Sequence, residues 1–429
     1  MTTSEFILQH RLSNPRDLAL QARRYPDVDM PYALNQIQGW QTARQKLPSW
    51  ASCDGVVYPP HLNMEQCSSE PTARYKQEVA LRWLNKLGVG HGGATTSMAD
   101  LTGGFGVDFS FTSRCFASAT YVERNSSLCD VVSGNLPRLG ISNANVVCAE
   151  AEDYLATMPQ QTMLFLDPAR RDEHGAKTVL IADCTPDVCR LLPQLMSKAR
   201  FVMLKLSPML DWHKAIADLK GTVDEVHIVS VGGECKELLL VLAGKVSVSS
   251  VDSGSLENGV RVYCVDIMAK ADADGEYKRS EFCYTIGGAA DNPPTLNPQP
   301  STLNSQLSTL NSQFLFEPNA SIMKAGCFAE LSQVYGVEAI GPNSHLFVSS
   351  GRVEQFPGRK FAIEAVCTLN KRQLKQTLGT LKQANIAVRN FPMSVAELRK
   401  RLKLRDGGDT YIFATTTMEG EHVLIICRK

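Results

Sequence analysis

The sequence has no excess of charge of either sign. Lys plus Arg and Asp plus Glu number 44 each in 429 residues, so the formal net charge at pH 7 is zero. A balanced chain exerts no long-range field on nucleic acid or on an anionic membrane. The sequence therefore excludes a uniformly basic nucleic-acid-binding protein, and any such affinity must come from a local patch.

Long apolar runs and paired cysteine motifs are also missing. No run approaches the roughly 18 apolar residues of a membrane span, and the start MTTSEFILQHRLSNPRD has no apolar core behind a basic end. The 13 cysteines form no Cys-x-x-Cys pair, and no histidine lies near the loose pair Cys184 and Cys189. These absences argue against a disulfide framework and a zinc site. We expect a soluble, cytoplasmic protein with reduced thiols and no metal.

The length predicts about three domains of roughly 150 residues each. The polar start of the chain has recurrent apolar positions, which favours short amphipathic helices. The uncharged repeat PTLNPQPSTLNSQLSTLNSQ is expected to be a flexible insertion without chemistry. The predicted boundaries are a helical region at 1–62, an α/β domain at 63–247, an α+β domain at 248–355 that contains the insertion at 294–313, and a basic domain at 356–429.

Apolar, strand-like runs alternate with amphipathic segments in the second region. This alternation predicts a parallel sheet with helices on both faces. The last two runs are close together and predict a terminal antiparallel hairpin. The runs are TSMADL, SATYVER, NANVVCAE, TMLFLDP, ARFVMLKLSP, DEVHIVSV and ELLLVLAG.

The segment MADLTGGFGVDFS, residues 98–110, is a strand followed by a glycine-rich turn and a helix. It lacks the Lys-Ser or Lys-Thr of a phosphate-binding loop, its glycines have the wrong spacing for a dinucleotide site, and Asp100 would repel a pyrophosphate. An aspartate at this place favours a cationic ligand. S-adenosylmethionine fits, because it carries an ammonium, a sulfonium and a ribose with two hydroxyls. The predicted cofactor-binding residues of the turn are Asp100, Thr102, Gly103, Gly104, Phe105, Gly106 and Asp108.

Acidic residues also follow the next three strand-like runs. Glu123 comes about 20 residues after the glycines, where a carboxylate can accept both ribose hydroxyls. Glu150 and Glu152 end the third run near the expected adenine, and either can make that contact. Asp167 ends the fourth run, over the methyl group. The cofactor-binding set therefore also includes Glu123, Arg124, Glu150, Ala151, Glu152 and Asp167.

This order of elements resembles the class I S-adenosylmethionine-dependent methyltransferases. More narrowly, MEQCSSEPTARYK, LDPARRD, KLSPMLD, GECKELL, EPNASIMKAG, FPGRKF and VRNFPMSVAELRKRLKLRDGGDTYIFATT resemble a bacterial family without a firmly known substrate. The resemblance covers nearly the whole chain. The sequence departs from the family pattern only at the repeat. It implies a Rossmann-like methyltransferase sheet, a ferredoxin-like α+β domain at 248–355 and a THUMP-like domain at 356–429.

The segment SSEPTA has two interpretations. Alone it predicts a helix N-terminus, with Ser68 or Ser69 as the cap and Pro71 in the first turn. The resemblance to guanine-N2 cap methyltransferases, which have a Thr-Pro-Glu segment beside the cofactor, implies that Ser68 and Glu70 also contact the cofactor.

The segment DPARR limits the chemistry. In methyl transfer from a sulfonium the enzyme mainly positions the nucleophile, and Asp167 and the Pro168 carbonyl can orient an amine. The aromatic residue of the related amino-methylating motif is replaced by Ala169 and Arg170. Arg170 can stack on a base through its guanidinium plane or hold a phosphate. The predicted catalytic residues are therefore Asp167, Pro168 and Arg170.

A carbon-methylating alternative stays open. DPAR also resembles the Asp-Pro-Pro-Arg of 5-methyluridine enzymes, which need a cysteine nucleophile. Cys235, in the predicted hairpin turn, is the candidate, and Asp172 and His174 are candidate proton acceptors.

The basic charge is concentrated near the C-terminus. Residues 371–405 hold ten Lys or Arg against the single acidic Glu397, which is the footprint of a phosphate backbone. With the THUMP resemblance, this predicts structured RNA, tRNA or rRNA, as the partner and methylation of a base at an amino or ring nitrogen. The alternatives are a small-molecule or protein methyltransferase, in which VAELRKRLKL is only a solvated helix, and a cofactor-binding scaffold without activity. The predicted RNA-binding residues are Arg399, Lys400, Arg401 and Lys403.

Overall fold

The structure is a computed structural model that describes residues 1–90, 95–170, 181–243, 259–287 and 313–429. Asp172, His174 and residues 294–312 of the expected insertion lie outside the described residues. The chain forms two compact units, which are described separately. The first comprises Met1–Val231, Lys236–Arg261 and Ile267–Tyr277, and the second Gly232–Cys235, Val262–Asp266 and Lys278–Lys429.

The N-terminal region is helical, as predicted. Helix α1 starts with a capping box in which Thr2 and Glu5 bond each other's backbone N–H groups. Phe6, Leu18 and Ile37 belong to a small buried core that joins the first three helices. The helices are α1 (Thr3–His10), α2 (Pro15–Leu20), α3 (Met30–Lys46), α4 (Pro48–Ala51) and α5 (His61–Gln66).

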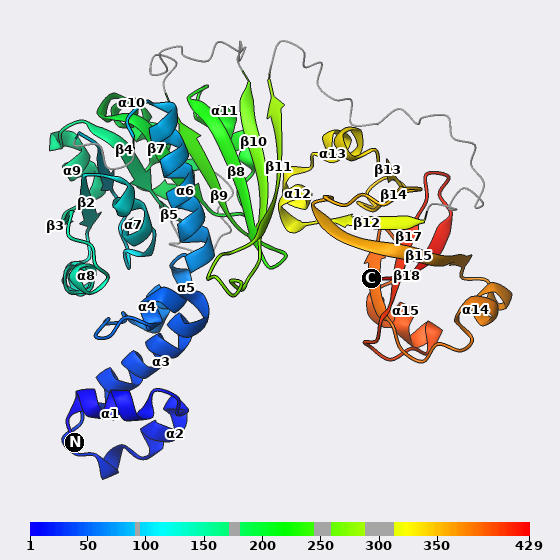
Figure 1. Cartoon of the computed structure of the whole chain (residues 1–429), viewed down its shortest axis with the longest axis horizontal. Coiled ribbons are helices and arrows are strands. Elements are labelled where there is room, and N and C mark those ends of the chain that lie inside the picture. The colour runs from blue at the N-terminus through cyan, green and yellow to red at the C-terminus, as the bar shows by residue number, and fades with distance from the viewer. Residues whose placement is uncertain (91–94, 171–180, 244–258, 288–312) are drawn as a thin grey trace. The chain divides into compact units, whose positions relative to one another are not determined.

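The larger of the two main sheets has nine strands (Figure 1). Its order is β11-β10-β8-β9-β7-β4-β1-β2-β3. β1 pairs in parallel with β2 and β4, while β7 pairs antiparallel with β9. The predicted parallel strands and the hairpin of β8 with β9 are confirmed, but the hairpin does not end the sheet. In chain order, the first seven strands of this sheet are β1 (Ser97–Asp100), β2 (Ser118–Glu123), β3 (Ala144–Cys148), β4 (Gln161–Leu166), β7 (Ala199–Leu206), β8 (Val223–Val231) and β9 (Glu234–Leu242).

Two further strands continue this order beyond β8. They are β10 (Val260–Ile267) and β11 (Arg279–Ile286). Both fall in the segment 248–355 for which a ferredoxin-like fold was expected. The boundaries at residues 62, 247 and 355 stay predictions.

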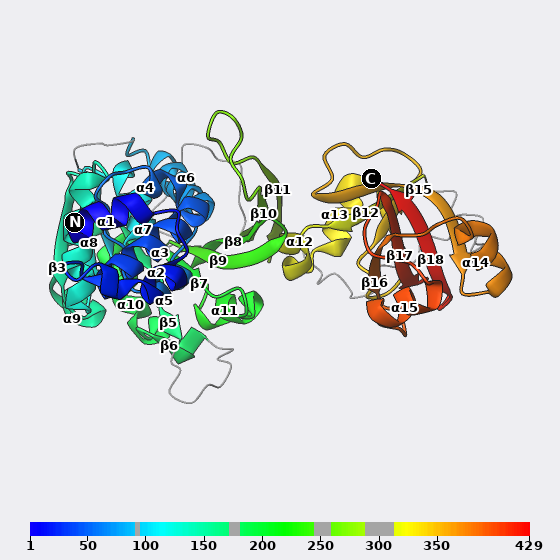
Figure 2. The ribbon, with the colours of Figure 1, turned by 90° about the horizontal axis from the view of Figure 1, so that it is seen from below.

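Helices cover both faces of the sheet, with α6 on one face and α11 on the other (Figure 2). Helix α6 begins after Ser69 and has Pro71 in its first turn, as predicted, but neither serine caps it through its side chain. Ser69 Oγ pairs with Thr72 Oγ1, and Ser68 Oγ donates to Asp108. The helices are α6 (Glu70–Lys86), α7 (Val107–Thr112), α8 (Ser126–Arg138), α9 (Ala151–Thr157), α10 (Val188–Lys198) and α11 (Trp212–Asp218).

The second unit contains a seven-stranded sheet of order β13-β14-β12-β15-β18-β17-β16. Phe413 packs in one core cluster, whereas its neighbours Ile412 and Ala414 pack in another. Because successive strand residues face opposite sides, the sheet has a core on each face. The strands are β12 (Phe314–Pro318), β13 (Glu338–Ala339), β14 (Phe347–Ser349), β15 (Gly358–Thr368), β16 (Asn385–Arg389), β17 (Thr410–Thr416) and β18 (His422–Arg428).

Two basic helices lie on the same face of this sheet. Leu378 of α14 and Leu398 of α15 are both buried in the cluster around Ile412. Their polar sides are left exposed. The helices of this unit are α12 (Ala320–Ala325), α13 (Phe328–Tyr335), α14 (Lys371–Leu378) and α15 (Val395–Leu402). None of the helices among the described residues combines the length and apolar character that crossing a bilayer requires.

Candidate active site

A cavity of about 570 Å³ opens where the parallel strands β1, β2, β3 and β4 end. Carboxyl ends of neighbouring parallel strands meet at one edge of a sheet, which is where ligands of such folds bind. The strand ends are far apart in sequence, and the sheet brings them together. The predicted residues that line the cavity are Ser68, Asp100, Thr102, Gly103, Gly104, Phe105, Gly106, Asp108, Glu123, Arg124, Glu150, Ala151, Glu152 and Asp167.

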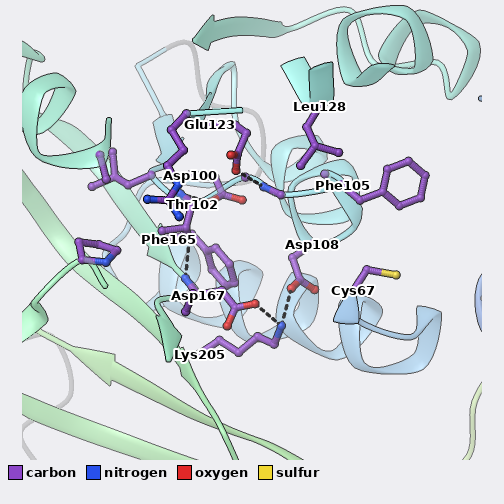
Figure 3. Close-up of a pocket in the computed structure, with 18 of the residues that line it drawn as sticks. Cys67, Asp100, Thr102, Phe105, Asp108, Glu123, Leu128, Phe165, Asp167 and Lys205 are labelled. Atoms are coloured by element: carbon purple, nitrogen blue, oxygen red, sulfur yellow. Dashed lines mark hydrogen bonds and ion pairs between the residues drawn. The ribbon is translucent and has the colours of Figure 1, made fainter. Parts of the chain in front are cut away.

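The glycine turn is shaped by close contact with β2. A Cβ at Gly103 would lie 2.1 Å from the Tyr121 ring, so a side chain there would collide with it. Gly106 has a φ of 78° and begins α7, a conformation that glycine adopts at little cost. The Gly104 N–H donates to Glu123 Oε2 over 2.9 Å (Figure 3). The turn and the end of β2 therefore form one rigid edge of the cavity.

Asp100 is buried at the base of this turn. Its Oδ1 accepts the Thr102 N–H over 3.0 Å. Burial raises the pKa of Asp100 well above its usual value, and the hydrogen bond from Thr102 opposes this only in part. Thr102 Oγ1 in turn accepts the Asp167 N–H over 2.6 Å. The ends of β1 and β4 are thus linked directly.

Lys205, which the sequence analysis missed, lies beside Asp167. Its Nζ is 2.5 Å from Asp167 Oδ2 and 3.6 Å from Asp108 Oδ2 (Figure 3). Burial lowers the pKa of Lys205, but the carboxylates of Asp167 and Asp108 outweigh burial, so the pKa lies above its usual value. A lysine inside the apolar run FVMLKLSP was the available signal, because a charged residue in a buried strand needs a partner.

A second lysine, Lys76, shares the partner Asp108 with Lys205. Lys76 of α6 is fully buried, and its Nζ lies 2.5 and 2.7 Å from the carboxylate oxygens of Glu237. It also lies 3.2 Å from Asp108 Oδ1, while Ser68 Oγ donates to Asp108 Oδ2 over 2.7 Å. Burial raises the pKa of Asp108, but Lys76 and Lys205 lower it by more, so it stays below its usual value. The charges alternate in the order Glu237, Lys76, Asp108, Lys205 and Asp167.

The acidic residues after β3 have different surroundings. Glu150 is exposed, whereas the Glu152 carboxylate forms an ion pair with Arg190. Both line the cavity. Contact of either one with adenine stays a prediction.

The N-terminal region supplies a wall that the sequence analysis did not foresee. Asn63 and Gln66 of α5 and the following Cys67 line the cavity. Trp50 packs edge-on against Phe105 of the glycine turn, with ring centroids 4.9 Å apart. This region therefore supports the turn as well as enclosing the cavity.

Three candidate residues, Glu70, Pro168 and Cys235, do not line the cavity, and the side chain of a fourth, Arg170, is not described. The Glu70 carboxylate accepts the N–H and hydroxyl of Ser49, both over 2.8 Å, and pairs with Arg74, so it holds α4 and α6 together outside the cavity. Pro168 and Cys235, both described, are not among the lining residues, whereas Ala169 is. The backbone of Arg170 belongs to β5 (Ala169–Arg170), which pairs with β6 (Cys184–Thr185), and its side chain lies outside what the structure describes.

The predicted RNA-binding residues lie on or just after α15 of the second unit. Lys400, Arg401 and Lys403 are exposed. Arg399 is engaged within the unit, because its guanidinium donates to Asp406 over 2.6 Å and to the Ala384 carbonyl over 3.1 Å.

Comparisons with known proteins identify both C-terminal domains. A family model of a THUMP domain-like domain matches residues 358–429, and one of a ferredoxin-like domain matches residues 314–357. The crystal structure of a "putative methyltransferase" from Porphyromonas gingivalis W83 is 27% identical, covers 100% of this chain and 97% of that chain, and has a TM-score of 0.78. No curated protein matches the sequence.

Shorter methyltransferase structures match part of the chain at low similarity. An rRNA methylase from Streptococcus thermophilus is 12% identical over 39% of this chain and 94% of that chain, with a TM-score of 0.29. A "putative methyltransferase" from Streptococcus mutans, solved in complex with SAH, is 10% identical over 34% of this chain and 87% of that chain, with a TM-score of 0.26.

The Porphyromonas gingivalis structure matches both the nine-stranded sheet and the two C-terminal domains of this chain. The chain is therefore similar over its whole length to a "putative methyltransferase", and its C-terminal end carries a ferredoxin-like and a THUMP-like domain.

Proposed function

We propose that the protein is an S-adenosylmethionine-dependent methyltransferase that modifies a base of structured RNA. The observation that carries the proposal is the single cavity that collects Asp100, Glu123 and Asp167 from the ends of β1, β2 and β4 around the glycine turn. Its volume is within the range of about 300–1,000 Å³ typical of small-molecule sites.

The residues present fit the cofactor. S-adenosylmethionine carries two positive charges in its amino acid and sulfonium groups, and Asp100 and Asp167 place carboxylates at this edge of the sheet. Each oxygen of Glu123 accepts one backbone N–H, from Gly104 or Asn125. A carboxylate oxygen has a further lone pair, so Glu123 can accept the ribose hydroxyls while staying fixed. When bound, the cofactor supplies an activated methyl group.

Asp167 is the residue assigned to the methyl acceptor. Its backbone N–H is held by Thr102 and its carboxylate by Lys205, so its orientation is fixed before a substrate arrives. Positioning of this kind is the main contribution an enzyme makes to an in-line displacement.

RNA is the substrate class favoured by the C-terminal domain. The model match to a THUMP domain-like domain covers residues 358–429, and such domains bind structured RNA. The same segment exposes Lys400, Arg401 and Lys403 on one helix end, which suits contact with phosphates. A small-molecule or protein substrate would leave these charges without a ligand.

Calorimetry with SAH tests the cofactor site. We expect micromolar affinity, which corresponds to about −8 kcal/mol. Glu123→Ala should weaken it at least tenfold, since lost charged hydrogen bonds cost about 1.5–3 kcal/mol. The exposed Asp130→Ala is the matched control. Wild-type affinity in Glu123→Ala would contradict the assignment of the cavity.

Methyl transfer to total RNA from cells that lack the gene tests the reaction. Asp167→Ala should abolish transfer while SAH binding stays within a few fold of wild type. Cys235→Ser should keep full activity, because Cys235 is not a lining residue. Loss of activity in Cys235→Ser with activity retained in Asp167→Ala would favour the carbon-methylating mechanism instead.

A further inference from the structure

The acceptor side of the cavity holds a hydrogen-bond acceptor and a donor side by side. Asp167 Oδ2 and Lys205 Nζ are 2.5 Å apart, and both residues line the cavity. Figure 3 shows their side chains meeting from the ends of two neighbouring strands. An ammonium has three N–H donors. One of them bonds Asp167 Oδ2, and Asp108 Oδ2 forms an ion pair at 3.6 Å, beyond hydrogen-bond distance. At least one donor is therefore available to a ligand.

A chain of buried ion pairs fixes the ammonium of Lys205. Asp108 pairs with both Lys205 and the fully buried Lys76, and Lys76 is held by Glu237. A side chain fixed by such a network loses little orientation freedom when a substrate binds. The charged and titratable groups around Lys205 are Asp167, Asp108, Glu237, Lys46, Cys67 and Lys76.

An acceptor beside a donor complements a group in which an N–H adjoins a carbonyl. Guanine N1 with its O6, and uracil N3 with its O4, have this lactam edge. When such a nitrogen loses its proton, negative charge spreads onto the adjacent oxygen, where a fixed ammonium stabilises it strongly. An exocyclic amine reacts through a neutral lone pair and develops no such charge, so it would gain nothing from Lys205.

Resting on the proposed function, we infer that Asp167 and Lys205 together select the lactam edge of a guanine or uracil base and direct methylation to its ring nitrogen. The nitrogen gives its proton to the Asp167 carboxylate, and its electron pair forms the bond to the methyl carbon. The sulfur–methyl bond breaks, and its electron pair stays on sulfur, which becomes a neutral thioether. Lys205 donates to the base oxygen throughout, and Asp167 passes the proton to water afterwards.

The first test is the identity of the product. Total RNA from cells that lack the gene is incubated with the wild-type protein and S-adenosylmethionine, digested, and analysed as nucleosides by mass spectrometry. We expect methyl groups on guanine N1 or uracil N3. Methylation of an exocyclic amine, of guanine N7 or of carbon would overturn the inference and leave the proposed function standing. No methylated nucleoside would overturn the RNA substrate itself.

The second test uses Lys205→Met and Lys205→Arg. Removing one donor to a developing negative charge typically costs about 100-fold or more in rate. Lys205→Met should lose this much at neutral pH and regain part of it at alkaline pH, where the lactam ionises without help, whereas Lys205→Arg should keep most activity. Calorimetry with SAH should give an affinity within a few fold of the wild type for both variants, which shows that the fold and the cofactor site are intact. An equal loss at every pH would assign Lys205 a structural role only.

Discussion

Lys76 shows how much of this site depends on single buried charges. It is fully buried in α6 and neutralises Glu237 and Asp108, which are themselves buried. A buried ion pair adds little stability compared with an apolar replacement of both partners. Removing one partner, however, leaves a charge buried without compensation, and that is costly.

We therefore expect Lys76→Met to destabilise the protein by about 3–5 kcal/mol, measured as a lower melting temperature. The double variant Lys76→Met with Glu237→Gln should recover part of the loss, because one uncompensated carboxylate is removed. Lys214→Met, at a half-exposed lysine of α11, is the control. A melting temperature equal to that of the wild type in Lys76→Met would contradict the alternating charge network.

Asp100 gives a prediction about pH. Burial raises its pKa well above 3.8, so in the free protein it becomes ionised only at a correspondingly higher pH. A cationic ligand needs the ionised carboxylate. SAH affinity, measured by calorimetry, should therefore increase as the pH rises through this elevated pKa. Asp100→Asn should bind more weakly and lose this dependence. An unchanged pH dependence in the variant would show that a group other than Asp100 controls it.

Site residues that are close in sequence could be predicted, whereas contacts between residues far apart in sequence could not. Asp100 and the glycines could be predicted because they lie within seven residues of one another. The sequence alone also shows that this segment contains no Lys or Arg and that an aspartate precedes its glycines. Lys205 meets Asp167 from 38 residues away, because β4 and β7 are parallel neighbours. The sequence predicted that Glu70 contacts the cofactor. In the structure α4 packs against α6, and the Glu70 carboxylate accepts the Ser49 N–H instead. Side-chain partners of this kind depend on tertiary structure.

At the scale of elements, the strands were the easiest to predict. Central strands such as β4 are buried on both faces and have near-continuous apolar sequences, and each of the seven runs became a strand. The strands β10 and β11 were harder, since a sequence does not show which sheet edge a strand joins. The basic helix α15 was predicted, but the ion pair of Arg399 with Asp406 was not.

That ion pair changes which residues of α15 should contact RNA. Lys400→Glu, Arg401→Glu and Lys403→Glu together should weaken binding to structured RNA and flatten its salt dependence. With a log–log slope of about −0.7 per phosphate on single strands, three lost contacts remove about two units. Filter binding at several salt concentrations measures this.

The matched control for α15 reverses Arg16, Arg23 and Arg24, three exposed arginines of the N-terminal region. It changes the net charge by the same amount. If both triple variants lose the same affinity, the effect is one of overall charge, and α15 is only a solvated helix.

At the scale of the whole molecule, the proposed cofactor site and the proposed RNA surface belong to different compact units. The cavity is built entirely from residues of the first unit, and α15 belongs to the second. Substitutions at sites that share no partner residues usually have additive effects on the free energy. The two binding steps should therefore be separable by mutation.

We expect the α15 triple variant to bind SAH with wild-type affinity while methyl transfer to RNA requires a higher RNA concentration. Glu123→Ala should show the reverse, with normal RNA binding and weakened SAH binding. Combining the substitutions should add the two losses within about 0.5 kcal/mol, measured by calorimetry with SAH and by filter binding with RNA. A coupling energy clearly above this value would mean that RNA bound to the second unit changes the cofactor cavity of the first.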